Sequence, residues 1–257
     1  MPPPAIQMTG VEKSFGANRV LRGVNLSVQR GRSLAIIGGS GTGKSVAVKC
    51  IIGLVEPDAG SIFLDGKDLS RTKGGFGSAN YGMLFQGGAL FDSMPVWQNV
   101  AFRLLRGSRG KEAALQIAIE KLARVGLSAD VAHLYPSELS GGMLKRAGLA
   151  RAIATDPEII FFDEPTTGLD PIMASVINEL IRGVVDEMGV TAVTITHDMA
   201  SVRTIAHEVV MLNRGIVEWA GNVDDLGQSG NSAVEQFVNG NAEGPLTAAA
   251  SRLPPAT

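Results

Sequence analysis

Apolar residues along the chain gather in short blocks, and the spacing within each block predicts its conformation. Val24, Leu26 and Val28 alternate with polar residues, which indicates a strand buried on one face. Strands at both ends of the chain, with helical segments between them, predict an α/β fold. The expected strands are 5–15, 23–31, 33–38, 61–66, 81–85, 158–164, 191–196, 208–213 and 215–221.

The middle of the chain has a helical pattern instead. Residues 111–126 are amphipathic with helical spacing and end in Gly126, a residue typical of the position just after a helix. Residues 140–155 predict a second helix. We therefore expect a helical subdomain at about 96–155 that interrupts the α/β body.

A further helix is predicted from Pro171 to about Met188, because Asp170 is a favourable N-cap residue and proline is favoured at the first helical position. No internal repeat is visible. We expect one domain at 1–240 and a tail at 241–257, rich in proline and alanine, that is disordered or clamped by a partner.

The bulk composition limits the classes of function. The chain has 257 residues, of which 45% are hydrophobic and 19% charged, enough for a large core. Its formal net charge of −2 argues against nucleic acid as a partner, since nucleic-acid-binding domains carry a basic surface. We interpret the basic cluster of Arg103, Arg106, Arg109 and Lys111 as a solvated face.

Cysteine content and hydropathy indicate a reducing compartment. Cys50 is the sole cysteine, and it lies in an apolar helical run, so we expect a buried packing residue. The N-terminal MPPPAIQ lacks the features of a signal peptide. No apolar run approaches the roughly 18 residues that span a bilayer. We expect a cytoplasmic protein whose membrane contact comes through a partner.

The clearest motif is a glycine-rich loop between an apolar strand and a helix. The sequence GGSGTGKS matches the G-x-x-x-x-G-K-[ST] pattern, in which backbone N–H groups and a helix N-terminus hold phosphates. Lys44 is expected to reach the β- and γ-phosphates, and the Ser45 hydroxyl to hold Mg²⁺. The predicted nucleotide-binding residues are Gly38, Gly39, Ser40, Gly41, Thr42, Gly43, Lys44 and Ser45.

Polar side chains follow three of the predicted strands. Asp163 and Glu164 end an apolar strand, where successive side chains point in different directions. Asp163 is therefore predicted to face Mg²⁺ while Glu164 acts as general base on a water molecule. Gln86 can contact the metal ion and the water, and His197 can contact the γ-phosphate from the carboxyl edge of its strand.

Ser140, Gly141 and Gly142 begin a predicted helix far from the phosphate loop in sequence. Glycine is costly inside a helix, so its presence here needs a reason. Free N–H groups and the helix dipole at this end can form a second anion site, and the glycines allow a phosphate to approach the backbone closely.

In combination, these motifs resemble the ATP-binding cassette (ABC) ATPases over roughly residues 5–225. The phosphate loop, Gln86, LSGG, the strand ending in Asp163-Glu164, TGLD and His197 follow the order of that family. The resemblance implies a P-loop NTPase of ABC type, with a mixed sheet, N-terminal antiparallel strands and a helical subdomain. It also implies ATP and Mg²⁺ as cofactors and hydrolysis of ATP.

The resemblance assigns further roles. Ser140 and Gly142 would cap the ATP bound by a second subunit, in a head-to-tail homodimer. Phe15 would stack on adenine, and Asp170 would belong to the loop that crosses the dimer. Gln86 would begin the loop that touches a membrane subunit.

Some positions depart from the commonest family pattern. Met143 stands where glutamine is usual, which removes hydrogen bonds to the nucleotide sugar but leaves the backbone anion site unaffected. Gly39 stands where proline is common, and Thr167-Gly168 where Ser-Ala is common.

Narrower features are similar to the ATPase subunits of Mla-type, MCE-associated phospholipid transporters. They are LFQGGALFDSMPVWQNVAFRL, ELSGGMLKRAGLARAI, DEPTTGLDPI and VEQFVNGNAEGP. The resemblance implies a homodimer on the cytoplasmic face of the inner membrane, bound to an integral permease. An MCE-type lipid-binding subunit and a small STAS-type cytoplasmic protein would complete the assembly. Phe237 and Val238 would lie on a short helix that contacts either a partner or the chain's own body.

Three alternatives stay open at this point. An ATPase subunit of a small-solute importer, for example for amino acids, would share the catalytic motifs and differ around Gln86 and in the tail. A soluble ABC-type ATPase acting on DNA or ribosomes is disfavoured by the near-neutral charge. A non-hydrolysing nucleotide-binding module is disfavoured by the intact set of Asp163, Glu164 and His197.

Overall fold

The computed structural model describes residues 3–69, 80–107 and 110–247. Arg109 and the last part of the predicted tail, 248–257, lie outside the described residues. Within the described part, no helix is long and apolar enough to cross a membrane.

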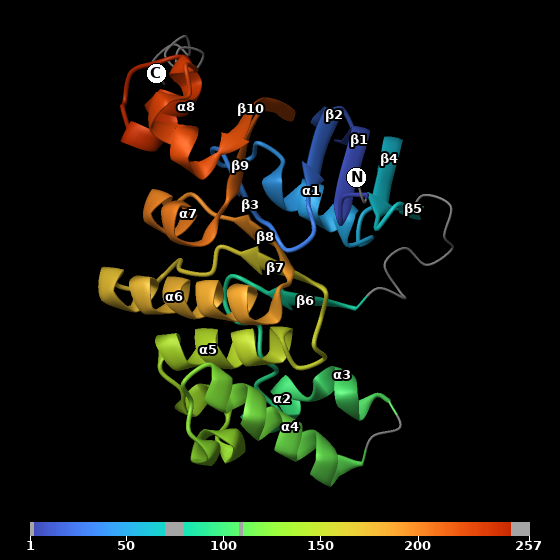
Figure 1. Cartoon of the computed structure of the whole chain (residues 1–257), viewed down its shortest axis with the longest axis vertical. Helices are drawn as coiled ribbons and strands as arrows, with labels where there is room; N and C mark the ends of the chain where they lie inside the picture. Colours follow the sequence, from blue (N-terminus) through green and yellow to red (C-terminus); the bar gives the residue numbers. More distant parts are fainter. Residues whose placement is uncertain (1–2, 70–79, 108–109, 248–257) are drawn as a thin grey trace, which may run out of the picture.

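Two sheets form the α/β body (Figure 1). The four-stranded sheet has the order β2-β1-β4-β5 and is antiparallel. The six-stranded sheet has the order β10-β9-β3-β8-β7-β6 and is parallel except for β10, so the expected mixed sheet with N-terminal antiparallel strands is confirmed. The strands are β1 (Ile6–Phe15), β2 (Asn18–Val28), β3 (Ser33–Ile37), β4 (Ala59–Leu64), β5 (Lys67–Asp68), β6 (Tyr81–Leu84), β7 (Ile159–Asp163), β8 (Thr191–Ile195), β9 (Glu208–Asn213) and β10 (Ile216–Asn222).

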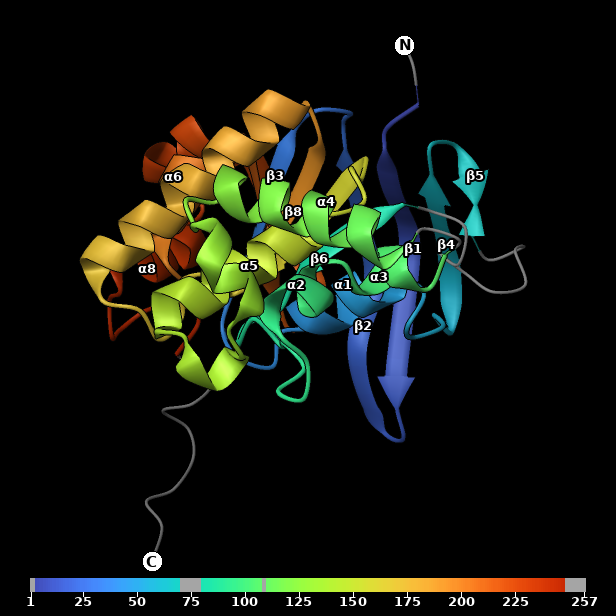
Figure 2. The same ribbon diagram turned by 90° about the horizontal axis from the view of Figure 1, so that it is seen from below.

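The helices pack around the sheets in several groups (Figure 1). Figures 1 and 2 show α2 to α5 gathered beyond β6, whereas α1 lies against the N-terminal strands. The predicted Asp170 cap and the Gly126 terminus are both present, whereas α7 was not anticipated. The helices are α1 (Lys44–Ile51), α2 (Val96–Val100), α3 (Phe102–Leu105), α4 (Lys111–Arg124), α5 (Gly141–Ala152), α6 (Pro171–Met188), α7 (Met199–Ile205) and α8 (Ser232–Asn239), with 3₁₀ turns at Ala129–His133, Pro136–Glu138 and Val223–Gln228.

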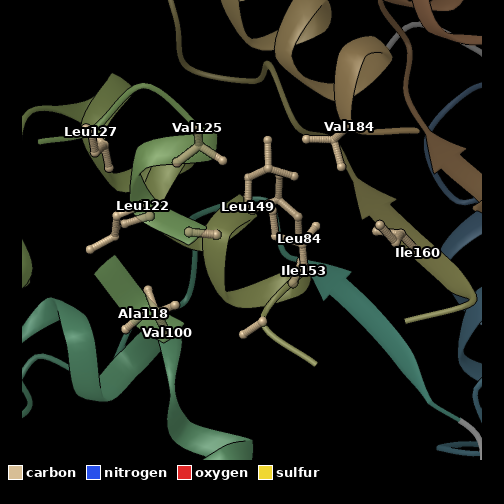
Figure 3. Packing of buried hydrophobic residues seen from close by; sticks show 14 of the residues in the cluster. Leu84, Val100, Ala118, Leu122, Val125, Leu127, Leu149, Ile153, Ile160 and Val184 are labelled. Carbon is tan, nitrogen blue, oxygen red and sulfur yellow. The ribbon is translucent and has the colours of Figure 1, made fainter. Parts of the chain in front are cut away.

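β7 lies between two hydrophobic clusters and is buried on both faces, as continuous apolar strands of parallel sheets are. Ile160 and Phe162 join the cluster formed with α2, α4, α5 and α6 (Figure 3). Ile159 and Phe161 join the cluster between the two sheets and α1. This packing fixes the strand, so the residues that follow it are held at a defined edge of the sheet.

Helix α8 packs onto the chain's own body. Val234 is fully buried, and Phe237 and Val238 pack against a cluster formed by β3, β9 and α7. Two arrangements of this helix were predicted, on a partner or on the chain's own body. Within the described residues, the structure has the helix on the chain's own body.

The segment after α8 folds back over one buried amide. Gln236 is only 5% exposed. Its Nε2 donates to Asn241 O and to Thr247 Oγ1, both at 3.1 Å. Its Oε1 accepts from the Leu246 N–H at 2.8 Å. All the polar atoms of this side chain are thus satisfied by the beginning of the tail.

Candidate nucleotide site

The phosphate loop connects β3 to α1 and depends on its glycines. Gly38 has φ +138°, and a Cβ atom there would lie 2.2 Å from Leu212 O of β9. Gly43 has φ +105° and caps α1, and a Cβ there would lie 2.9 Å from Val20 O. Gly41 also has a positive φ, of +73°. The loop is therefore an open backbone cradle at a helix N-terminus, which suits a chain of phosphates.

Lys44 supplies positive charge inside this cradle. Its Nζ donates to Gly38 O and Gly39 O, both at 2.8 Å, so the ammonium group is held at the centre of the loop. Burial lowers the pKa of Lys44, while Glu164 and Asp163 act in the opposite direction. The side chain can neutralise phosphate oxygens held by the loop.

Asp163 ends β7 on the same edge of the sheet. Its pKa is raised by burial and then by repulsion from Glu164, and it is lowered in part by Lys49 and Lys44. A bound cation would offset both the cost of burying the Asp163 carboxylate and its repulsion from Glu164. Among the described residues there is no group of three or more His, Cys, Asp or Glu side chains that could hold a metal ion. Mg²⁺ fits a single carboxylate next to a hydroxyl and phosphates, so Asp163 and Ser45 suit this ion.

Glu164 is held in place through its backbone and its carboxylate. It has φ +48°, an unusual conformation for a non-glycine residue, and its N–H donates to Ile195 O at 2.9 Å. Oε1 lies 2.9 Å from His197 Nδ1, and Oε2 accepts from Thr167 Oγ1 at 3.0 Å. The side chain of Glu164 is 15% exposed and that of His197 63%. A carboxylate fixed in this way can accept a proton from a water molecule at the pocket.

A pocket of about 440 Å³ brings most of the predicted residues together. Phe237 of α8 also lines it, which the sequence did not suggest because the residue is far away along the chain. The lining residues are Gly38, Gly39, Ser40, Gly41, Lys44, Ser45, Gln86, Asp163, Glu164, Ile195, His197 and Phe237.

The remaining predicted residues do not line this pocket. Ser140 caps α5, where its Oγ accepts from the Met143 N–H at 3.3 Å. Asp170 caps α6 by accepting from two backbone N–H groups at 3.0 Å each. Phe15 ends β1 and is 51% exposed, with Lys13 Nζ at 5.5 Å from its ring centroid. Ser140 and Gly142 are thus separate from the chain's own phosphate loop.

Sequence reasoning missed a buried cation behind the pocket. Lys145 of α5 is 5% exposed, and its Nζ donates to the backbone carbonyl of Gln86 and, at 3.4 Å, to that of Glu164. Burial lowers its pKa, against the effect of Glu164 and Asp163. One feature of the sequence could have indicated that Lys145 is buried. It lies on the apolar face of a predicted helix, three residues before Gly148 and four before Leu149.

The chain is similar in sequence to known proteins over most of its length. A family model described as ABC transporter matches residues 21–167. The probable ribonucleotide transport ATP-binding protein Mkl of Mycobacterium tuberculosis is 41% identical over 94% of this chain and 68% of its own length. The intermembrane phospholipid transport system ATP-binding protein MlaF of Escherichia coli K12 is 39% identical over 94% of this chain and 91% of its own length.

Solved structures agree on the fold. A dimeric post-hydrolysis state of the ATP-binding cassette MJ0796, bound to ADP and Pi, has a TM-score of 0.77 at 29% identity, covering 85% of this chain and 98% of the other. The CbiO1 protein of Clostridium perfringens, part of the ABC transporter complex CbiONQ, has a TM-score of 0.80 at 26% identity, covering 93% and 96%.

Proposed function

The chain belongs to the ABC transporter family and is an ATPase, and from this premise we propose that it powers the transport of phospholipid between two membranes. The observation that carries the chemical part of the proposal is the Glu164 carboxylate. It is fixed between His197 and Thr167 in a pocket that it shares with the phosphate loop.

In our proposal the loop 38–45 holds the phosphates of ATP and Lys44 neutralises the β- and γ-phosphates. Ser45 and Asp163, with Gln86, are assigned to Mg²⁺. When bound, this ion would withdraw charge from the phosphate oxygens.

Glu164 is proposed as the general base. It would accept a proton from the attacking water, while Gln86, which lines the same pocket, would orient that water. His197 is proposed to contact the γ-phosphate, and its Nδ1 lies 2.9 Å from the Glu164 carboxylate.

We further propose that two copies enclose two ATP molecules. Support comes from the position of Ser140 and Gly142, which lie at the N-terminus of α5 outside the chain's own pocket. They would contact the nucleotide of the second copy. Asp170 would lie in the loop that crosses the dimer, and Phe15 would stack on the adenine.

Phospholipid is proposed as cargo because the chain resembles Mla-type subunits in sequence. The MlaF relatives of Escherichia coli and Haemophilus influenzae carry phospholipid transport in their names. The protein would bind an integral permease at the cytoplasmic face of the inner membrane, with an MCE-type lipid-binding subunit and a small STAS-type protein. We divide the chain into an ATPase domain at 1–240, with a helical subdomain at about 96–155, and a tail at 241–257. The name of the Mkl relatives offers ribonucleotide transport as the competing cargo.

The cargo is tested by tagging the chain in its own cell, solubilising the membranes gently and identifying the proteins and lipids that co-purify. A permease with an MCE-type subunit and bound phospholipid is the expected result. A permease with a small-solute binding protein would retain the ATPase and overturn the lipid proposal.

The proposed chemistry is tested with Glu164→Gln. We expect it to bind ATP and to form an ATP-dependent dimer in gel filtration, while phosphate release falls at least about 100-fold. Phosphate release at the wild-type rate would exclude Glu164 as the base.

A further inference from the structure

Two basic side chains of helix α5, the buried Lys145 and the partly buried Arg151, bond the loop that follows β6. Besides Lys145, Arg151 donates from Nη1 to Ala89 O and from Nη2 to Gly88 O, both at 2.7 Å. Carbonyl groups of residues 86, 88 and 89 are thus all held by one helix. Ala89 has φ +49°, so the loop adopts a conformation that needs such support.

Close backbone packing joins the same two segments. A Cβ atom on Gly148 of α5 would lie 3.2 Å from Gly88 Cα and 2.8 Å from Leu84 Cδ1. Leu84 and Leu149 are fully buried neighbours in the adjoining core (Figure 3). Since densely packed segments move together, α5 and the 86–89 loop form one unit.

Lys145 extends this unit to the end of β7. Its ammonium group has no carboxylate partner among the ion pairs of the described residues, and it donates to two backbone carbonyls instead. A buried ammonium is costly unless its hydrogen bonds are made, so its location is well defined. One of these carbonyls belongs to Glu164, whose N–H and carboxylate are fixed by other groups.

We propose that Lys145 is a positioning residue for ATP hydrolysis, which sets the direction of the Glu164 carboxylate by holding the Glu164 carbonyl against α5. This rests on the proposed function, in which Glu164 is the base. The left-handed conformation of Glu164 has few alternatives once both its N–H and its C=O are fixed. Lys145 does not line the pocket but bonds two residues that do, so it acts on the reaction through Glu164 and Gln86.

The test compares Lys145→Met with Lys121→Met. Lys121 on α4 is equally buried, at 4% exposure, but pairs with Asp156 Oδ1 at 2.6 Å, away from the nucleotide pocket. For Lys145→Met we expect kcat to fall about 10- to 100-fold, while the Kd for ATP, measured with a fluorescent analogue, stays within about twofold. Lys121→Met is expected to lower Tm without changing kcat.

Lys145→Arg keeps a cation that can donate to both carbonyls and is expected to restore most of the kcat. Adding Lys145→Met to Glu164→Gln should lower the residual rate by much less than Lys145→Met does alone, because both changes affect one group. If Lys145→Met does not fold, Lys145→Gln is measured in the same way.

Three results would overturn the proposal. The first is an unchanged kcat in folded Lys145→Met. The second is a change in kcat no larger than that of Lys121→Met. The third is a kcat in the Lys145→Met, Glu164→Gln double variant that falls by the full product of the two single losses. A fully active Glu164→Gln would instead contradict the proposed base, and is read separately from the Lys145 variants.

Discussion

Two helices of this protein begin with glycine-rich segments, yet the two ends are built differently. At α1 the N-cap is Gly43, with φ +105° and no side-chain hydrogen bond to the first turn. At α5 the N-cap is Ser140, whose hydroxyl bonds the Met143 N–H, and neither Gly141 nor Gly142 has a positive φ. The first end needs glycine both for its backbone conformation and for space against Val20 O, whereas at the second end a Cβ on Gly142 would meet only the end of the Met173 side chain, at 2.5 Å.

The charged groups around the two ends differ as well. The α1 end contains Lys44 and faces Asp163 and Glu164, so its charged groups suit a phosphate chain and a metal ion. The α5 end presents exposed Ser140 and Gly141 and directs its own cation, Lys145, backward to carbonyl groups. The comparison teaches that the charged groups suited to a phosphate chain gather at the α1 end, while the α5 end lies apart from them in the same chain, consistent with the proposed dimer.

The largest effect is expected at the α1 end. Lys44→Ala removes the charge at the centre of the loop, so we expect the Kd for ATP to rise at least about 100-fold, since charge-assisted hydrogen bonds to phosphate are lost. Isothermal titration calorimetry measures this. Lys67→Ala is the control, because Lys67 is exposed on β5 and does not line the pocket. Unchanged affinity in Lys44→Ala would contradict the assignment of the loop.

An intermediate effect is expected at the α5 end. Ser140→Ala removes an N-cap, which should cost about 1 kcal/mol of stability, and should slow hydrolysis without changing ATP affinity of the monomer. Ser140→Asn keeps a capping side chain, so it should retain stability while hydrolysis still falls. Urea unfolding and phosphate release separate the two losses. If Ser140→Asn is fully active, the hydroxyl has no role beyond the cap.

The smallest effect is expected at Cys50, in the last turn of α1. Burial raises the pKa of this thiol from 9.0 to about 11. Because the folded state then keeps a proton that the unfolded chain releases, stability should fall as the pH rises from about 9 to about 11. The free energy of unfolding, measured with urea, should drop less between pH 8 and pH 10 in Cys50→Ala than in the wild type. ATPase activity at pH 8 should be the same in both proteins. An equal fall in both proteins would show that the thiol does not contribute.

Local signals predicted most strands and several helix termini, but β2 begins at Asn18 rather than at 23, and β5 was not predicted. The span Pro171–Met188 was anticipated because Asp170 and Pro171 mark the start of the helix. Helix α7 was missed, although Asp198 caps it, because its seven residues are too few for a clear periodic pattern.

The site was predictable where a motif specifies chemistry and not where distant segments meet. The loop 38–45, Asp163 and Glu164 could be found from residue types alone. The contact of Glu164 with Thr167 and the presence of Phe237 in the pocket depend on tertiary packing. Lys145 was hidden because a lysine is ordinarily expected at the surface.

The fold-back over Gln236 has a practical consequence for where the chain can be shortened. Ending the protein at residue 247 would keep every group that bonds the Gln236 amide. Ending it at residue 240 would remove the segment that covers this amide, which would then exchange its protein hydrogen bonds for water at a cost of about 0.5–1.5 kcal/mol for each bond. It would also loosen the helix that carries Phe237 to the nucleotide pocket. Removing these seven residues is thus expected to alter the wall of the candidate nucleotide pocket where Phe237 lies.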